Sequence, residues 1–323
     1  MSDVVLDEPV YSTDLDANEV QEGATAGPGE VDAPDDLGVE AVLADLLGSP
    51  AESESAAVET APDTTGLKSA LEATYTIEPP APTPVPSVAI AESVVGVDNR
   101  IRITNTDTYP WSAHASLLIT ARDGTLWLGT AFFIGPRVLA TAGHNVFIHS
   151  PIAARQGWVR SVRVMPGRNG NELPFGSATT SRYASVTGWT VNGPNPDYDY
   201  AVIILDEDDG LGAQTGTLGF GSYSDSTLRS LYVNLSGYPS DRGSGREQWY
   251  MGGRIEDLSN RQIFYEIDTF GGQSGSAVYR ITDGQRYAVG IHAYGVGSRP
   301  YNAATRITRP VFDNLLAWKN DNT

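Results

Sequence analysis

Three short motifs contain residues whose types suit nucleophilic catalysis. Ser274 lies within the glycine-rich run GGQSGS, His144 ends the run TAGH, and Asp199 opens the apolar run DYAVIIL. A serine hydroxyl is a weak nucleophile until a base takes its proton, and a carboxylate on the second imidazole nitrogen keeps a histidine base in the right tautomer. The chain order His–Asp–Ser therefore predicts an acyl-transfer triad, and it differs from the orders of subtilisin and the α/β-hydrolases.

Each member of this triad also has a structural alternative. Ser274 alone would fit a Gly/Ser-rich hairpin turn, and His144 is one of only four histidines. His149 lies in a less regular stretch and is interpreted as solvated. Asp197, two residues before Asp199, is the rival carboxylate. We favour catalysis because the three motifs occur together and in order.

Attack on a carbonyl builds negative charge on its oxygen, which needs donors aimed at it. Gly271 and Gly272 allow backbone conformations that most residues avoid. We therefore expect the backbone N–H groups of Gly272 and Ser274 to form an oxyanion hole.

No cofactor is expected for this chemistry. The chain has no cysteine, which excludes disulfides and thiolate metal sites. The acidic run 206–209 lacks the ligand spacing and terminal glutamate of a calcium loop, so we interpret it as a solvated loop. We predict neither a metal nor an organic cofactor.

Charge is distributed unevenly along the 323 residues. Residues 1–92 contain 20 acidic residues and one basic residue, Lys68, so the whole net charge of −19 belongs to this segment. Residues 93–323 are neutral overall and show no basic patch for nucleic acid. No apolar run reaches the length of a membrane span, and the start lacks the features of a signal peptide.

The acidic segment and the remainder differ in pattern. Residues 1–35 are acidic, poor in aromatics and predicted to be disordered, and 79–86 is a proline-rich linker. Beyond it, short apolar and aromatic runs recur between Gly, Asn, Asp and Pro, which is typical of an antiparallel barrel or sandwich. The C-terminus changes to helical periodicity, with Thr308 as candidate N-cap. Its apolar face comprises Val311, Leu315, Leu316 and Trp318.

The chain resembles the bacterial glutamyl endopeptidases, and most nearly the secreted Bacillus enzymes, from about Ser93 to Lys319. Besides the three motifs, the resemblance rests on the runs SVVG (93–96), RITNT (102–106), PGRNG (166–170), SGYP (236–239), DTF (268–270), GIH (290–292), TRIT (305–308) and VFDNL (311–315). It implies an all-β fold of two six-stranded antiparallel barrels of the chymotrypsin type. The expected boundaries are about 93–208 and 209–307 for the barrels and 308–319 for the closing helix.

Substrate specificity has two competing interpretations. Asp268 lies six residues before Ser274, the offset of the carboxylate that binds Arg or Lys in trypsin-type enzymes. The resemblance instead implies cleavage after Glu, and more slowly after Asp, with Thr269, His292 and the amino group of Ser93 forming the pocket. A buried glutamate needs donors and positive charge, which this set supplies. The alternative for His292 is a structural histidine in the core. The alternative for the whole chain is a non-catalytic, protease-like binding module.

Activation is expected to depend on Glu92 and Ser93. The Glu92–Ser93 bond directly precedes the first residues that match the family. Residues 1–92 are therefore interpreted as a pro-segment that is removed by cleavage of this bond. The alternative is that they form a permanent acidic tether. Where relatives keep an aspartate before the catalytic serine, this chain has Gln273. The resemblance implies a secreted monomer acting on proteins or peptides, without nucleic-acid or membrane partners.

Overall fold

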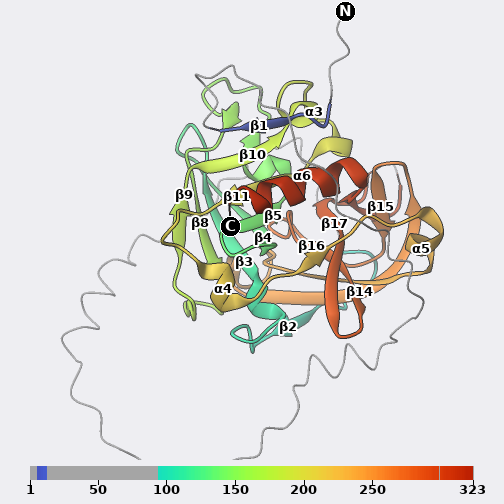
Figure 1. The fold of residues 1–323 in the computed structure, drawn as a ribbon. Helices are drawn as coiled ribbons and strands as arrows, with labels where there is room; N and C mark the ends of the chain where they lie inside the picture. Colours follow the sequence, from blue (N-terminus) through green and yellow to red (C-terminus); the bar gives the residue numbers. More distant parts are fainter. Residues whose placement is uncertain (1–5, 13–93, 298, 323) are drawn as a thin grey trace, which may run out of the picture. The chain divides into compact units, whose positions relative to one another are not determined.

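Two large β-sheets, antiparallel except for one short parallel pair, form most of the described part of the chain (Figure 1). The structure is a computed structural model, and it describes residues 6–12, 94–297 and 299–322. The proline-rich stretch 79–86 and the Glu92–Ser93 bond lie outside these residues, as does most of the segment predicted to be disordered.

The first sheet contains the strands of the N-terminal barrel. Its order is β1 (Pro9–Tyr11), β10 (Arg182–Val186), β11 (Ala201–Ile204), β5 (Val138–Thr141), β4 (Leu126–Phe133), β3 (His114–Thr120), β8 (Ser161–Pro166) and β9 (Ala178–Thr180). Six strands from β10 to β8 form the central run, and the short strands β1 and β9 lie at its ends.

The second sheet closes on itself. Its order is β17 (Gln285–Tyr294), β16 (Ala277–Thr282), β13 (Tyr232–Gly237), β14 (Gln248–Leu258), β15 (Gln262–Tyr265) and β18 (Asn302–Arg306). Because β17 also pairs with β18, these six strands form a closed barrel. The short strands β12 (Gly219–Phe220) and β2 (Ile101–Ile103) add to β17 and β14.

Short helices and one small ribbon complete the described part of the chain. They are the 3₁₀ turns η2 (Trp111–Ala113), η3 (Gly143–Asn145), η4 (Pro196–Tyr198) and η5 (Gly243–Gly245), the helices α3 (Thr187–Thr190), α4 (Leu211–Thr215), α5 (Asp225–Ser230) and α6 (Arg309–Asn320), and the strands β6 (Phe147–Ile148) and β7 (Gly157–Trp158). Helix α6 follows Thr308, as the sequence predicts, although the Thr308 side chain makes no capping bond.

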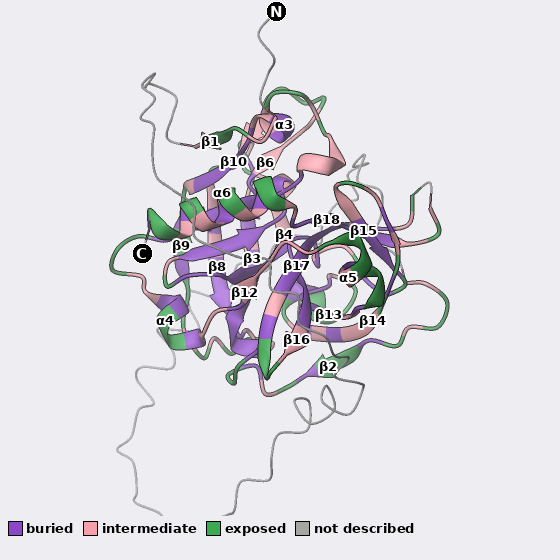
Figure 2. Cartoon of the chain, turned by 45° about the vertical axis from the view of Figure 1, so that its right-hand side comes forward, coloured by how far each residue is buried: buried purple, intermediate pink, exposed green. Residues whose placement is uncertain are grey.

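One hydrophobic core joins the two barrels. It combines side chains of β5 and β11 with side chains of β16 and β17, and the apolar face of α6 covers it through Val311, Leu315 and Trp318. Each barrel also has its own core. In Figure 2 the strands are mostly buried, while the loops and the outer face of α6 are exposed. The loops at the junction of the barrels are thereby fixed from both sides.

The predicted all-β fold of two six-stranded barrels with a C-terminal helix is confirmed. Two features differ in detail from the sequence-based expectations. The predicted disorder of residues 1–35 is wrong for residues 6–12, because the edge of β10 pairs with Pro9–Tyr11 as β1. In addition, β2 lies in the second sheet although it precedes the first barrel. No helix in the described part of the chain is long and apolar enough to cross a membrane.

Candidate active site

His144 lies in the short turn η3, directly after the buried strand β5. The residue before it must be glycine, because a Cβ at Gly143 would lie 2.9 Å from Asp199 Oδ1 and 2.9 Å from Trp189 Cδ1. Such distances are shorter than ordinary atomic contacts. The TAGH motif therefore lets the backbone approach the carboxylate closely and leaves the His144 side chain 30% exposed.

Asp199 is fully buried, two residues before β11. Strands β11 and β5 pair with Ala201 opposite Thr141, and this register brings Asp199 to His144. Asp199 Oδ2 lies 2.7 Å from His144 Nδ1, and Oδ1 accepts the His144 backbone N–H at 2.9 Å. Thr305 Oγ1 donates to the Asp199 carbonyl oxygen at 3.0 Å. The carboxylate thus orients both the ring and the backbone of His144.

The rival residues have other contacts. The backbone N–H of Asp197 donates to Asn195 Oδ1, and its carbonyl oxygen accepts from Arg261 Nε at 3.0 Å. His149 Nε2 lies 2.6 Å from the carbonyl oxygen of Trp189, against whose ring it packs. The expectation of a solvated His149 is wrong, because this histidine supports the wall beside His144.

Tyr294 is a third group on the carboxylate that the sequence interpretation missed. Its hydroxyl donates to Asp199 Oδ2 at 2.5 Å. Burial, together with the charge of Asp199, raises the pKa of Tyr294 well above its usual value, so the hydroxyl stays protonated and remains a donor. A bulge lies between His292 and Tyr294 in the pairing of β17 with β18. Bulges redirect side chains and are invisible in sequence periodicity.

Ser274 lies in the turn between β15 and β16, at the junction of the barrels. Its carbonyl oxygen accepts the backbone N–H of Thr130 at 2.9 Å and Asn145 Nδ2 at 2.8 Å. The following residue, Gly275, donates its N–H to the carbonyl oxygen of His292 at 2.7 Å. Both barrels therefore hold the serine turn, and Asn145, the residue after His144, links the two motifs directly.

The backbone before Ser274 has the geometry that glycine permits. Gly272 has φ +102°, and a Cβ there would lie 2.7 Å from the carbonyl oxygen of Tyr238. The Gly272 carbonyl oxygen accepts Thr130 Oγ1 at 2.8 Å. This bond fixes the peptide between Gly272 and Gln273, so the direction of the neighbouring amides is set by the fold.

Gln273 connects the serine turn to the start of the catalytic domain. Its Oε1 accepts Arg100 Nη1 at 3.2 Å and the Phe270 backbone N–H at 3.0 Å. Arg100 also bonds the carboxylates of Asp98 and Asp241. Burial alone would lower the pKa of Arg100, but these two carboxylates raise it, so the guanidinium stays charged.

Asp268 is fully buried and is bound by the same segment. Its Oδ1 accepts the backbone N–H of Val95 at 2.7 Å, and its Oδ2 accepts that of Asn99 at 2.9 Å. Both carboxylate oxygens therefore anchor residues that follow the predicted cleavage bond.

The residues of the predicted Glu pocket are near the serine turn. Thr269 and His292 are both fully buried. His292 exchanges backbone bonds with Gly275 and Ser276, and its Nδ1 lies 2.6 Å from the Tyr265 hydroxyl. Within the described residues, Thr269 Oγ1 has no hydrogen-bond partner. Ser93 and Glu92 lie outside the described residues.

In the described ranges, no three His, Cys, Asp or Glu residues are grouped so that they could hold a metal ion. The run 206–209 follows β11, and its first three residues are exposed.

This geometry defines a class: two barrels with a His–Asp pair and a serine turn at their junction are the features of chymotrypsin-type serine proteases. No family model matches the chain. Glutamyl endopeptidase of Bacillus licheniformis is 38% identical over 235 residues, which is 71% of this chain and 70% of that protein. The chain therefore belongs to the glutamyl endopeptidase family, and it is a serine endopeptidase.

More distant relatives agree, with one exception in name. Glutamyl endopeptidase of Staphylococcus epidermidis is 24% identical and covers 72% of this chain and 75% of that protein. A Bacillus subtilis protein, 34% identical over 71% of this chain and 70% of its own length, is named extracellular metalloprotease.

Solved structures with this fold include serine proteases. A Glu endopeptidase in complex with MPD matches with a TM-score of 0.61 and 29% identity, covering 70% of this chain and 99% of that one. The protease Anisep of Arthrobacter nicotinovorans matches with a TM-score of 0.54 and 16% identity over 64% of this chain and 96% of its own, which supports the fold alone.

Proposed function

We propose that His144, Asp199 and Ser274 act as the catalytic triad of an endopeptidase that forms an acyl-enzyme. The His144–Asp199 hydrogen bond at 2.7 Å carries this proposal. Ser274 Oγ attacks the scissile carbonyl carbon while His144 Nε2 takes its proton, and Asp199 holds Nδ1–H. The oxyanion receives hydrogen bonds from the N–H groups of Gly272 and Ser274.

The second half of the reaction uses the same groups in reverse. The tetrahedral intermediate collapses when the peptide C–N bond breaks, and His144 gives its proton to the leaving amine. A water molecule then attacks the ester of Ser274, with His144 again as base, and releases the acid. None of these steps is assigned to a metal or an organic cofactor.

Replacing the nucleophile tests this mechanism. Ser274→Ala should lower kcat by about 10³- to 10⁶-fold, because oxyanion stabilisation and binding alone retain little activity. Ser240→Ala is the control: Ser240 lies beside the same turn, where its N–H bonds the Gly271 carbonyl oxygen. A Ser274→Ala enzyme that keeps activity within tenfold of the parent would contradict the assignment.

For specificity, we propose cleavage after Glu, and more slowly after Asp, through Thr269, His292 and the amino group of Ser93. Three observations support this pocket. Asp268 is already bound by Val95 and Asn99, which disfavours its use for Arg or Lys. Thr269 offers a buried hydroxyl without a partner in the described part of the chain. Two of the relatives above are named glutamyl endopeptidases.

Burial adds one requirement to this proposal. Thr269 and His292 are inaccessible in the full-length chain, so a substrate carboxylate reaches them only after the pocket opens. This fits an enzyme made as a precursor. We therefore propose that residues 1–92 are a pro-segment and that cleavage at Glu92–Ser93 frees the amino group of Ser93.

We also propose that the enzyme is secreted and acts as a monomer. Its partners are protein or peptide substrates, without nucleic acid or membrane.

Digestion of a denatured protein, with the cut bonds read by mass spectrometry, tests the specificity. Cuts should cluster after Glu, with fewer after Asp. His292→Val should lower kcat/KM for a Glu substrate far more than it lowers the thermal unfolding temperature, since an unpaired buried carboxylate costs several kcal/mol. Cuts after Arg and Lys would assign the pocket to Asp268 instead.

A further inference from the structure

The N-terminal end of the acidic segment is docked on the catalytic domain as a strand. β1 pairs antiparallel with the outer edge of β10, with Val10 opposite Ser185 (Figure 1). The pairing continues on both sides of β1. The N–H of Thr187 donates to the Glu8 carbonyl oxygen at 2.9 Å, and the N–H of Ser12 donates to the Tyr183 carbonyl oxygen at 2.9 Å.

Asp7 is recognised by side chains from distant parts of the catalytic domain. Arg261 bonds both of its carboxylate oxygens, Nη1 to Oδ2 at 3.1 Å and Nη2 to Oδ1 at 2.5 Å. The Tyr200 hydroxyl donates to Oδ1 at 3.1 Å, and Asn314 Nδ2 of α6 donates to the Asp7 carbonyl oxygen at 2.8 Å. A bidentate pair of this kind is specific in geometry as well as charge. The guanidinium also stacks on Tyr198.

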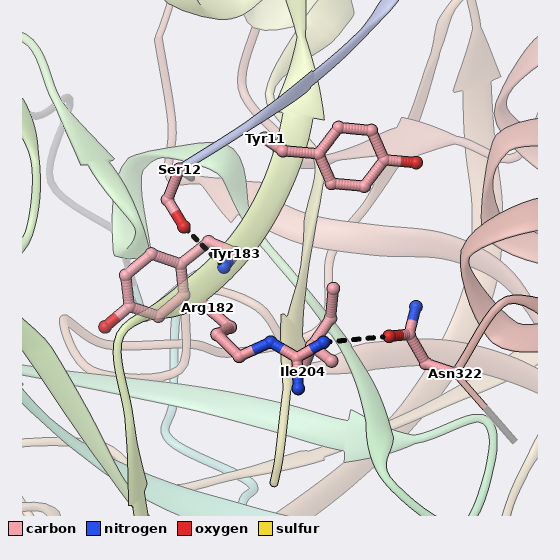
Figure 3. A pocket seen from close by; sticks show the side chains of 6 residues that line it. All are labelled: Tyr11, Ser12, Arg182, Tyr183, Ile204 and Asn322. Carbon is pink, nitrogen blue, oxygen red and sulfur yellow. Dashed lines mark hydrogen bonds between the residues drawn. The ribbon is translucent and has the colours of Figure 1, made fainter. Parts of the chain in front are cut away.

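Ser12 ends the docked strand in a second set of contacts. Its Oγ accepts the Tyr183 N–H at 2.9 Å and donates to the Ser181 carbonyl oxygen at 3.0 Å. Figure 3 shows Tyr11 and Ser12 beside Arg182, which reaches across a cavity of about 80 Å³ to bond Asn322. The docked strand is thus bound at both ends and along its backbone.

The part of the chain from residue 94 onward supplies each of the partners named above. Cutting the chain at Glu92–Ser93 leaves all of these contacts in place. An extended peptide added to a sheet edge gains affinity from its backbone bonds and specificity from its side chains. This surface has both, with an acidic side chain as the specific feature.

We propose that the edge of β10, with Arg261 and Asn314, is a docking site that retains the N-terminal segment as a separate, non-covalently bound chain after processing. This inference rests on the proposed cleavage at Glu92–Ser93 and deepens it: the mature enzyme is a two-chain complex held through residues 6–12. The Leu6 carbonyl oxygen accepts the N–H of Gly188, next to Trp189. Arg261, which binds Asp7, also donates from Nε to the carbonyl oxygen of Asp197, two residues before Asp199.

An engineered cut tests retention without relying on the protein's own activity. The full-length Ser274→Ala chain receives the recognition sequence of an unrelated site-specific protease within 79–86 and is cut to completion. The N-terminal fragment should co-elute with the catalytic domain in native gel filtration and give a 1:1 complex in native mass spectrometry. Separation of the two fragments at micromolar concentration would overturn the proposal.

Matched variants of the detachable fragment test the site. Asp7→Asn removes one charge from the Arg261 pair and should weaken the complex about ten- to a hundredfold. Glu8→Gln removes the same charge from the adjacent exposed residue and should leave affinity within about twofold. Both changes lie outside the catalytic domain. Equal affinities for Asp7→Asn and Glu8→Gln would contradict docking at Arg261.

A peptide experiment and N-terminal sequencing separate this inference from the processing proposal. A labelled peptide of residues 4–14 should exchange into the cut complex, whereas its Asp7→Asn version should not. Sequencing the active wild-type enzyme should give two N-termini, one of them Ser93. A fully active uncut chain would refute processing, and the engineered cut would still decide whether the strand is retained. Loss of the N-terminal fragment from the active, processed enzyme would refute retention.

Discussion

Asp199 is held by more donors than the sequence motifs suggest. Its two carboxylate oxygens form hydrogen bonds with His144 Nδ1, the His144 backbone N–H and the Tyr294 hydroxyl. Burying a carboxylate is costly unless hydrogen-bond donors replace the water that it loses. If His144 is the base that we propose, Tyr294 is a positioning residue: its hydroxyl fixes the carboxylate that orients His144.

We predict that Tyr294→Phe lowers kcat about tenfold with little change in KM, because a hydrogen bond to a charged group contributes roughly 1.5–3 kcal/mol. With one donor fewer, Asp199 attracts the proton on His144 more strongly, so the acid limb of the pH–rate profile should move to higher pH. Tyr287→Phe on the same strand is the control. An unchanged acid limb together with unchanged kcat would leave Tyr294 with a purely structural role.

The residues that sequence reasoning found are those whose neighbours in the chain reveal them. His144, Asp199 and Ser274 lie in short motifs, and each follows or precedes a recognisable strand. Tyr294 and Asn145 act through the fold instead: one is redirected by a bulge and the other bonds the carbonyl oxygen of a residue far along the chain. No local pattern encodes either contact, so a single sequence does not predict it.

Among the elements, the segment 94–103 differs most from its predicted place. The sequence predicts it as part of the first barrel, yet β2 pairs with β14, and the backbone of this segment binds Asp268. Periodicity identifies a strand but not its partner, because pairing depends on contacts distant in sequence. The same reasoning explains β1: residues 6–12 include the apolar side chains Leu6, Val10 and Tyr11 without an alternating pattern, and they form a strand because they pair with the edge of β10 and bind Arg261 through Asp7.

Arg100 ties this segment to the serine turn, and we expect its loss to disturb both. Its side chain is fully buried, and its partners Asp98 and Asp241 are about a quarter exposed. Arg100→Ala should lower the free energy of unfolding by about 1–3 kcal/mol, after allowance for solvent screening, and lower kcat about tenfold or more. Urea unfolding in the Ser274→Ala background measures the first effect, and peptide hydrolysis the second.

Arg102→Ala is the matched control for Arg100→Ala. Arg102 lies two residues further on, is 42% exposed and pairs with Glu247. A surface ion pair contributes about 0–1 kcal/mol, so both unfolding and kcat should stay close to those of the parent. If Arg100→Ala behaved like Arg102→Ala, the link through Gln273 would have no role in the serine turn.

For the whole molecule, the fold class was predictable because turn residues separate regularly spaced strands and because α6 has a clear apolar face. The domain-level charge was equally readable, since all net charge lies in residues 1–92. What the composition could not indicate is that part of this acidic segment binds the neutral domain. That contact combines the backbone pairing of β1 with β10 and one ion pair, Asp7 with Arg261, and neither can be inferred from net charge.

Acid stability is a property of the whole fold that a single buried histidine should influence. His114 is fully buried at the start of β3, with Nδ1 3.1 Å from the Pro110 carbonyl oxygen. Its Nε2 has no hydrogen-bond partner in the described part of the chain. Burial lowers the pKa of His114 from 6.5 to about 4, although the bond to Pro110 opposes this shift.

The sign of the effect follows from proton binding. Between pH 6.5 and 4 the unfolded chain binds a proton at His114 that the folded chain does not, so stability is present above pH 6.5 and is lost as the pH falls. The loss should approach about 3 kcal/mol at pH 4. Urea unfolding of the Ser274→Ala protein at pH 7 and pH 4.5 should show this decrease, and His114→Gln should reduce the difference between the two pH values, whatever its effect at neutral pH. An equal decrease in both proteins would show that other groups determine the acid lability of the fold.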